Sequence, residues 1–175
     1  IICRGYDYIY LLPHPSLRSW ISNYSITFSD GVGFSENYTI IPHGSATLVV
    51  TLEEHGMCGT LFGPMTRPLI VGSQANRCHM IIIVEFQPAG LYMLTGIPQR
   101  ELCDRTFPLD EIERKLSDCI LRISLAAKSV QEAVDGLDKL FYDSQKRTGE
   151  GAAFRGLLEA VLKQDRFTSV QELAQ

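Results

Sequence analysis

The hydrophobic pattern of the chain changes character near residue 90. Before that point, short runs rich in Ile, Val, Thr, Tyr and Phe are separated by Gly and Pro, and such runs are typical of strands joined by turns. Residues 46–52 partly alternate between apolar and polar, which predicts one buried face, whereas the apolar run 81–84 predicts a strand covered on both faces. Residues 17–21 also fit a short helix that leads into the second strand. The predicted strands are residues 6–12, 20–28, 35–42, 45–53, 57–62, 68–73 and 79–87.

After residue 100 the apolar residues follow a helical spacing instead. Three stripes recur every three or four residues, and each predicts the core-facing side of an amphipathic helix. The stripes are Leu109, Ile112, Leu116, Ile120 and Ile123; then Val130, Val134, Leu137, Leu140 and Phe141; then Phe154, Leu157, Leu158, Val161 and Leu162. The polar residues 144–151 predict a loop between the second and third helices. Ser169 and Glu172 form a capping box, which predicts that another helix begins there.

Together these elements predict an α+β protein in which the strands come first and the helices follow. About seven short strands at this spacing are typical of a sandwich or a barrel. The formal net charge is −4, with 16 Lys and Arg against 20 Asp and Glu. A nucleic-acid-binding domain usually carries a basic face, so we expect no DNA-binding residue in this chain.

Cysteine usage and hydropathy indicate a cytoplasmic location. The five cysteines are irregularly spaced and form no C-x-x-C motif, which predicts free thiols in a reducing compartment. No signal peptide is expected, and no apolar run approaches the roughly 20 residues of a membrane span. The cysteines are Cys3, Cys58, Cys78, Cys103 and Cys119.

The residues that could carry catalysis are scattered. His14, His43, His55 and His79 form no H-x-H pair, so no metal site and no cofactor are expected. No G-x-S-x-G or H-E-x-x-H motif is present, and we expect no catalytic residue. The alternative is a metal-dependent enzyme, in which His79 and Glu85, six residues apart on one predicted strand, share a face.

Six segments, in order along the chain, carry a shared set of motifs: 10–17 (YLLPHPSL), 42–50 (PHGSATLVV), 63–68 (GPMTRP), 85–90 (EFQPAG), 96–109 (GIPQRELCDRTFPL) and 168–174 (TSVQELA). Together they resemble AraC-type bacterial transcription regulators, and the first five resemble the amino-terminal domain of that family. The longest resembles that family's G-V-P-x-x-E-L-x-D-x-x-x-P-L motif, and the last resembles the first helix of its helix-turn-helix module.

The resemblance implies a cupin-like β-barrel or jelly roll followed by a small helical bundle. It assigns residues 1–95 to sensing, 96–166 to a helical dimerisation and linker region, and 167–175 to the start of a helix-turn-helix domain that continues beyond Gln175. The implied function is ligand sensing, dimerisation, or both. The implied partners are a small-molecule effector, a second copy of the chain, and DNA through the carboxy-terminal domain. The stripes at 109–123 and 130–141 either form the dimer or relay surface or only pack against the barrel.

Five residues are candidates for contacting the effector: Trp20, Tyr38, His43, Arg67 and Glu85. The many aromatic residues among the first forty either line such a pocket or fill the core. Arg67 lies on a loop stiffened by two prolines, where it can either clamp a carboxylate bidentately or bond backbone carbonyls and close the barrel.

The sequence departs from the family pattern at three positions. His43 stands where the family usually has Asp, Glu85 where it usually has Arg, and Ala89 where it usually has Gly. If the family's Asp and Arg contact a common ligand, these departures predict a different ligand here. A third alternative, besides the sensor and the metal enzyme, is a dimerisation module that takes no ligand and fills its interior with its own side chains.

Overall fold

A computed structural model describes residues 3–4, 8–28, 39–42, 44–71, 77–88 and 90–144. The chain divides into two compact units, residues 1–145 and 146–175, and all described residues belong to the first. The strands in this part are β1 (Cys3–Arg4), β2 (Tyr8–Leu11), β3 (Ile21–Phe28), β4 (Thr39–Ile40), β5 (Thr47–Glu53), β6 (Gly56–Phe62), β7 (Leu69–Ile70), β8 (Met80–Phe86) and β9 (Thr106–Pro108). The helices are the 3-10 helix η1 (Pro15–Leu17) and the α-helices α1 (Gly90–Thr95), α2 (Gln99–Leu102), α3 (Leu109–Ala126) and α4 (Val130–Ser144).

Seven of the strands form one antiparallel sheet in the order β1-β2-β3-β8-β5-β6-β9, and β4 pairs with β7 in a separate two-stranded sheet. The α+β class, with strands followed by helices, is therefore confirmed. Within the described residues the large sheet is open, because its edge strands β1 and β9 do not pair with each other. The expected closed, cupin-like barrel is therefore not confirmed.

The strand register gives the large sheet two chemically different faces. Tyr24, Val84, Leu48 and Leu61 are register partners across four strands, and all four side chains are buried. The next row, Ser25, Ile83, Val49 and Thr60, points to the opposite face because successive side chains of a strand alternate. Of the side chains in this second row, only Ser25 is fully buried.

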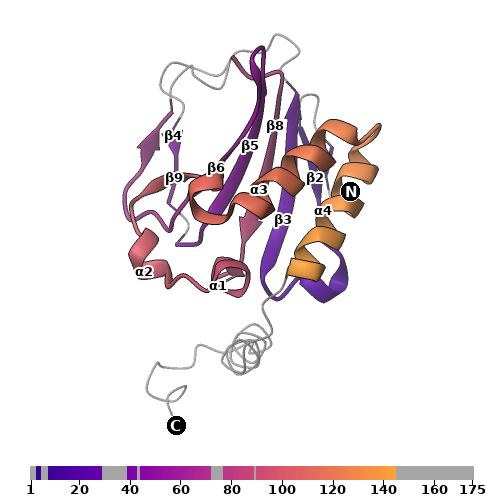
Figure 1. Cartoon of the computed structure of the whole chain (residues 1–175). Helices are drawn as coiled ribbons and strands as arrows, with labels where there is room; N and C mark the ends of the chain where they lie inside the picture. The colour runs from indigo at the N-terminus through magenta and orange to yellow at the C-terminus, as the bar shows by residue number, and fades with distance from the viewer. Residues whose placement is uncertain are drawn as a thin grey trace. The chain divides into compact units, whose positions relative to one another are not determined.

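Helices α3 and α4 lie across the face that carries the buried row (Figure 1). Leu116, Ile120, Val134, Leu137 and Phe141 from the two predicted stripes enter the core that they share with the sheet. The aromatic ring of Phe141 lies 6.4 Å from those of Trp20 and Tyr24 and 6.3 Å from that of Phe86. The stripes at 109–123 and 130–141 therefore pack against the sheet, and a role in dimerisation or relay stays a prediction.

The structure differs from the predicted elements at a few places, and part of the prediction lies outside the described residues. The apolar run at 81–84 is fully buried only on its helix-facing side, while Ile81 and Ile83 are half-buried on the other. Residues 15–17 form the short helix η1, close to the alternative proposed for 17–21. The third apolar stripe and the capping box at Ser169 lie outside the described residues. No helix in the described part of the chain is long and apolar enough to cross a membrane.

Candidate functional site

A cavity of about 780 Å³ lies on the sheet face that α3 and α4 do not cover. Its floor consists of side chains from β2, β3, β5, β6 and β8 that alternate with the core residues of the same strands. Residues of β4 and β7, the two-stranded sheet, form part of the opposite wall. The volume lies within the range of roughly 300–1,000 Å³ that is usual for small-molecule sites.

The lining of this cavity combines hydroxyl groups with aliphatic walls. Hydroxyl side chains line it at Tyr8, Tyr10, Ser25, Thr27, Thr39, Ser45, Thr47, Thr51 and Thr60. Aliphatic side chains line it at Ile40, Ile41, Val49, Leu69, Val71, Ile81 and Ile83. The charged side chains in the lining are Glu53 and Glu85, and no lysine, arginine or histidine of the described segments takes part.

The register sets the two carboxyl groups at opposite ends of the cavity. Glu85 on β8 pairs with Thr47 at the start of β5, and Glu53 ends β5 six residues later. At roughly 3.3 Å per residue, this places their positions about 20 Å apart along the strand. Between them lie two rows of lining residues, centred on Ile83 and on Ile81.

At one end of the cavity, Glu85 is half-buried and held by a neighbouring strand. The Nδ2 group of Asn23 on β3 donates a hydrogen bond of 2.9 Å to its Oε2 atom. Asn23 and Glu85 are register partners, so the pairing of β3 with β8 creates this contact. A carboxylate accepts up to about four hydrogen bonds, so one amide donor leaves capacity for a ligand.

At the other end, two thiols lie near Glu53. Cys78 donates a long hydrogen bond of 3.9 Å from Sγ to Oε1 of Glu53, and Cys58 lies 3.0 Å from the Thr51 hydroxyl. Burial raises the pKa of the Cys78 thiol, and the nearby carboxylate of Glu53 raises it further. Since the thiolate is the nucleophile, these surroundings do not favour nucleophilic catalysis by Cys78. Cys58, Cys78, Cys103 and Cys119 are free, as expected.

Comparison with known proteins identifies a family for the strands that build this cavity. Residues 10–108 match the family described as a domain of unknown function, DUF6597. The chain belongs to the DUF6597 family. No match was found among the curated proteins, and none among the solved structures. The DUF6597 segment runs from β2 to β9 and includes all of the described residues that line the cavity except Tyr8.

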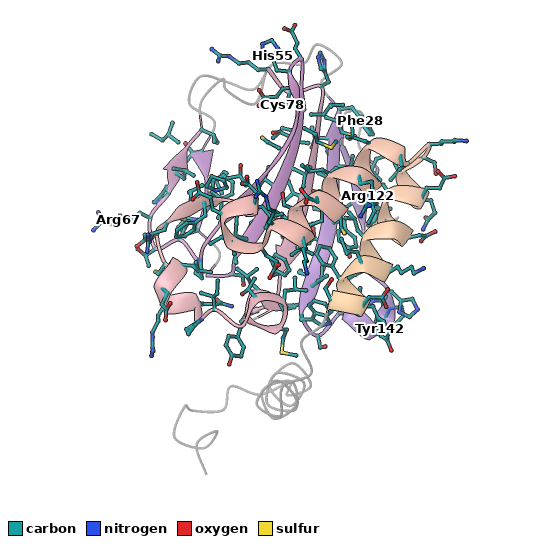
Figure 2. The ribbon with its side chains drawn as sticks, viewed as in Figure 1. Phe28, His55, Arg67, Cys78, Arg122 and Tyr142 are labelled. Atoms are coloured by element: carbon teal, nitrogen blue, oxygen red, sulfur yellow. The ribbon has the colours of Figure 1, made fainter. Side chains whose placement is uncertain are left out.

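Of the five residues predicted to contact an effector, the DUF6597 structure places Glu85 in the cavity. Trp20 is buried on the helix-facing side against Phe141 and is not part of the lining. Arg67 is exposed and points outward at the edge of the molecule (Figure 2). Tyr38 and His43 lie outside the described residues. The aromatic residues Tyr8 and Tyr10 do line the cavity, on the edge strand β2.

The loop that carries Arg67 is closed by its neighbour Thr66. Asp104 accepts hydrogen bonds from the backbone N–H of Thr66 at 2.6 Å and from its hydroxyl at 2.7 Å. These bonds hold the pKa of the Asp104 carboxyl below its usual value. They join the segment 63–68 to the segment 96–109. The loop is thus fixed through Asp104, which the sequence interpretation had not singled out.

The metal-enzyme alternative depends on histidines and acidic residues, and among these His43 lies outside the described residues. No group of three or more His, Cys, Asp or Glu side chains in the described part of the chain could hold a metal ion. His14 caps η1, His55 lies in the turn between β5 and β6, and His79 is exposed just before β8. Glu53, which sequence reasoning missed, is found only when the register shows that it shares a face with Thr47 and Thr51.

Proposed function

We propose that this DUF6597 chain is the regulatory domain of an AraC-type transcription regulator and that it senses a small organic effector. The observation that carries the proposal is the cavity of about 780 Å³ on one face of a sheet whose other face holds two helices. The segments that resemble AraC-type regulators support the assignment. In this proposal a DNA-binding domain follows Gln175, the protein acts as a homodimer, and it works in the cytoplasm.

Two adjacent residues of β3 connect the cavity to helix α4. Ser25 lines the cavity, and its chain neighbour Tyr24 lies on the other face of β3. The Tyr24 hydroxyl donates a 2.8 Å hydrogen bond to Asp138 on α4. A ligand that displaces β3 therefore also displaces an anchor of α4. It shifts the regulator between two states only to the extent that it binds one of them more tightly.

The cavity also favours the sensor over its alternatives. A dimerisation module without a ligand predicts an interior filled by its own side chains, whereas the described side chains leave a cavity. The β4–β7 pair over the open face is consistent with a jelly roll, which remains part of the proposal.

Native mass spectrometry of the purified chain, combined with metal analysis of the same sample, tests this function. We expect a dimer, and a stoichiometric small organic molecule when the effector co-purifies. A dimer without added mass supports the oligomerisation role and leaves the sensing role to titration with candidate ligands. A stoichiometric redox metal would contradict the proposal in favour of a cupin-type enzyme. A reading frame that stopped soon after Gln175 would also contradict it.

A further inference from the structure

The geometry points to the class of ligand that the cavity takes: an organic cation with a primary ammonium group and an apolar body, with Glu85 as its counter-ion. This inference rests on the proposed sensing role and specifies it further. Its three supports are the charge of the cavity lining, the position of the Glu85 carboxylate, and the apolar path that leads away from it.

The first support is electrostatic. Glu85 and Glu53 are the ionisable charges among the described lining residues, and both are acidic. A concave site with one sign of charge and low-dielectric walls concentrates its field and raises the local concentration of oppositely charged ligands. An anionic ligand would have to lose its hydration shell and approach like charges, and such burial of unpaired charge is costly. The cavity therefore discriminates against carboxylates and phosphates.

The second support is the setting of Glu85. It lies on β8, which is hydrogen-bonded on both sides to β3 and β5, so its backbone is fixed within the sheet. Asn23 orients its carboxylate through a bond to Oε2. A half-buried carboxylate oriented by a neutral amide is suited to an ammonium group, since the amide adds a donor without neutralising the charge. Glu53 lies at the exposed end of β5, so its carboxylate is not half-buried within the sheet as that of Glu85 is.

The third support is the path from Glu85 towards Glu53. Ile83 and Ile81 follow Glu85 on the same face of β8, at intervals of about 6.7 Å. Val49 lies beside Ile83 on β5 and widens this apolar strip. Ser25 and Thr27 flank the strip on β3. An alkyl chain anchored at Glu85 would therefore lie on aliphatic side chains, while the hydroxyl groups remain at its edges.

The test uses three probes that share one alkyl chain and differ in head group: n-octylammonium, 1-octanol and octanoate. Each is titrated into the purified full chain by isothermal titration calorimetry. We expect n-octylammonium to bind one per chain and at least about tenfold more tightly than either other probe, because only its ammonium group brings a positive charge to a hydrogen bond with the Glu85 carboxylate. Raised salt should weaken only the ammonium probe, since screening acts on the charge pair.

Two variants assign the effect to Glu85. Glu85→Gln keeps the size of the side chain and an acceptor for Asn23, and we expect it to weaken n-octylammonium at least about tenfold while leaving 1-octanol unchanged. Glu111→Gln makes the same change of charge at an exposed position of α3, outside the cavity, and should leave all three affinities unchanged.

The outcomes separate this inference from the sensing role. Equal binding of the three probes, or of n-octylammonium to wild type and Glu85→Gln, would overturn the cation assignment and leave the sensing cavity in place. Preference for octanoate would overturn it in the same way. Binding of none of the probes would overturn the inference as well, and the mass-spectrometric test would then decide the sensing role on its own. The comparison of probes on wild type needs no variant, so a poorly folded Glu85→Gln protein would not remove the test.

Discussion

Gly63 lies where the loop after β6 closely approaches the segment between α2 and β9. Its backbone N–H donates a 2.9 Å hydrogen bond to the carbonyl of Arg105, and a Cβ atom at Gly63 would overlap the backbone carbonyl of Leu102. The backbone N–H of Asp104 donates to the Pro64 carbonyl at 2.9 Å in the same joint. The backbones approach so closely here that only a residue without a side chain fits.

Gly63→Ala should therefore destabilise the protein by about 3 kcal/mol, the upper end of the usual cost of overpacking, because backbone atoms rather than a flexible side chain must move. The measurement is the free energy of unfolding in urea. Gly44→Ala is the control, because Gly44 has a positive φ of 73° but open space around its Cβ position. It should cost only about 1–2 kcal/mol. Equal losses in the two variants would show that the collision at Leu102 is relieved cheaply.

The sequence predicts only part of what individual residues do in this structure. The two prolines of segment 63–68 predict a stiff loop, but not that Asp104, almost forty residues away, closes it through Thr66. Glu85 could be named as a candidate because it departs from the pattern of the family that the segments resemble, which usually has Arg there. Trp20 could not be placed correctly, because an aromatic side chain predicts burial without saying on which face of the sheet.

Among the elements, α4 is attached to the sheet by both apolar and polar contacts. Phe141 packs among three aromatic rings, and Asp138 accepts hydrogen bonds from the Tyr24 hydroxyl at 2.8 Å and from the backbone N–H of His14 at 2.9 Å. Burial raises the pKa of the Asp138 carboxyl above its ordinary value, although these two bonds act in the opposite direction. Burial also holds the pKa of Tyr24 far above its usual range, so its hydroxyl stays protonated and remains a donor.

This raised pKa makes the attachment of α4 dependent on pH. Folded Asp138 retains its proton where the unfolded chain has lost it, so its contribution to stability is present below about pH 3.9 and is lost as the pH rises through the folded pKa. Tyr24→Phe removes the hydrogen bond that lowers the pKa of Asp138. In this variant the loss of stability with rising pH should therefore extend to higher pH. Asp138→Asn has no carboxyl group at this position, so it should lack this pH-dependent loss of stability. Urea unfolding of the three proteins across this pH range measures the effect, and parallel pH profiles would contradict it.

The two long helices α3 and α4 were predictable, whereas the short helices α1 and α2 and the smallest strands were not. The stripes of α3 and α4 recur over more than three turns, so their period identifies both the helices and their buried faces. Strand β9 has three residues and shows no period of its own, because it forms only by pairing with Thr60–Phe62 of β6. Within the described residues, β4 and β7 each contribute two residues, and parts of the predicted strands 35–42 and 68–73 lie outside the described residues.

At the scale of the whole molecule, one sheet separates the helical core from the cavity. Val49 and Val50 are adjacent on β5, yet Val50 is 1% exposed beneath the helices while Val49 lines the cavity. The alternation within β5 predicted such a difference in burial. It did not predict the open sheet, because closure depends on pairing between distant short strands.

Val50→Ala should cost about 2 kcal/mol, since two buried methyl groups are lost and a void remains in the core. Val49→Ala should cost less than about 1 kcal/mol, because it only widens an existing cavity. The two variants share the same change in strand propensity, so each is the control for the other. Urea unfolding provides both values, and equal costs would mean that the cavity face is packed as tightly as the helix face.

The alternation of side chains between the two faces of this sheet also limits which sequence changes the family can accept. Inserting or deleting one residue inside β5 or β8 would exchange the two faces beyond that point, turning Ile83 or Val49 towards the helices and core residues towards the cavity. A lineage that acquires a new ligand must therefore do so by substitution at alternate positions while keeping its strand lengths. Gaps in these strands should be rare among relatives. Under the proposed sensing role, side chains at cavity positions such as Glu85 should vary more than the core residues between them.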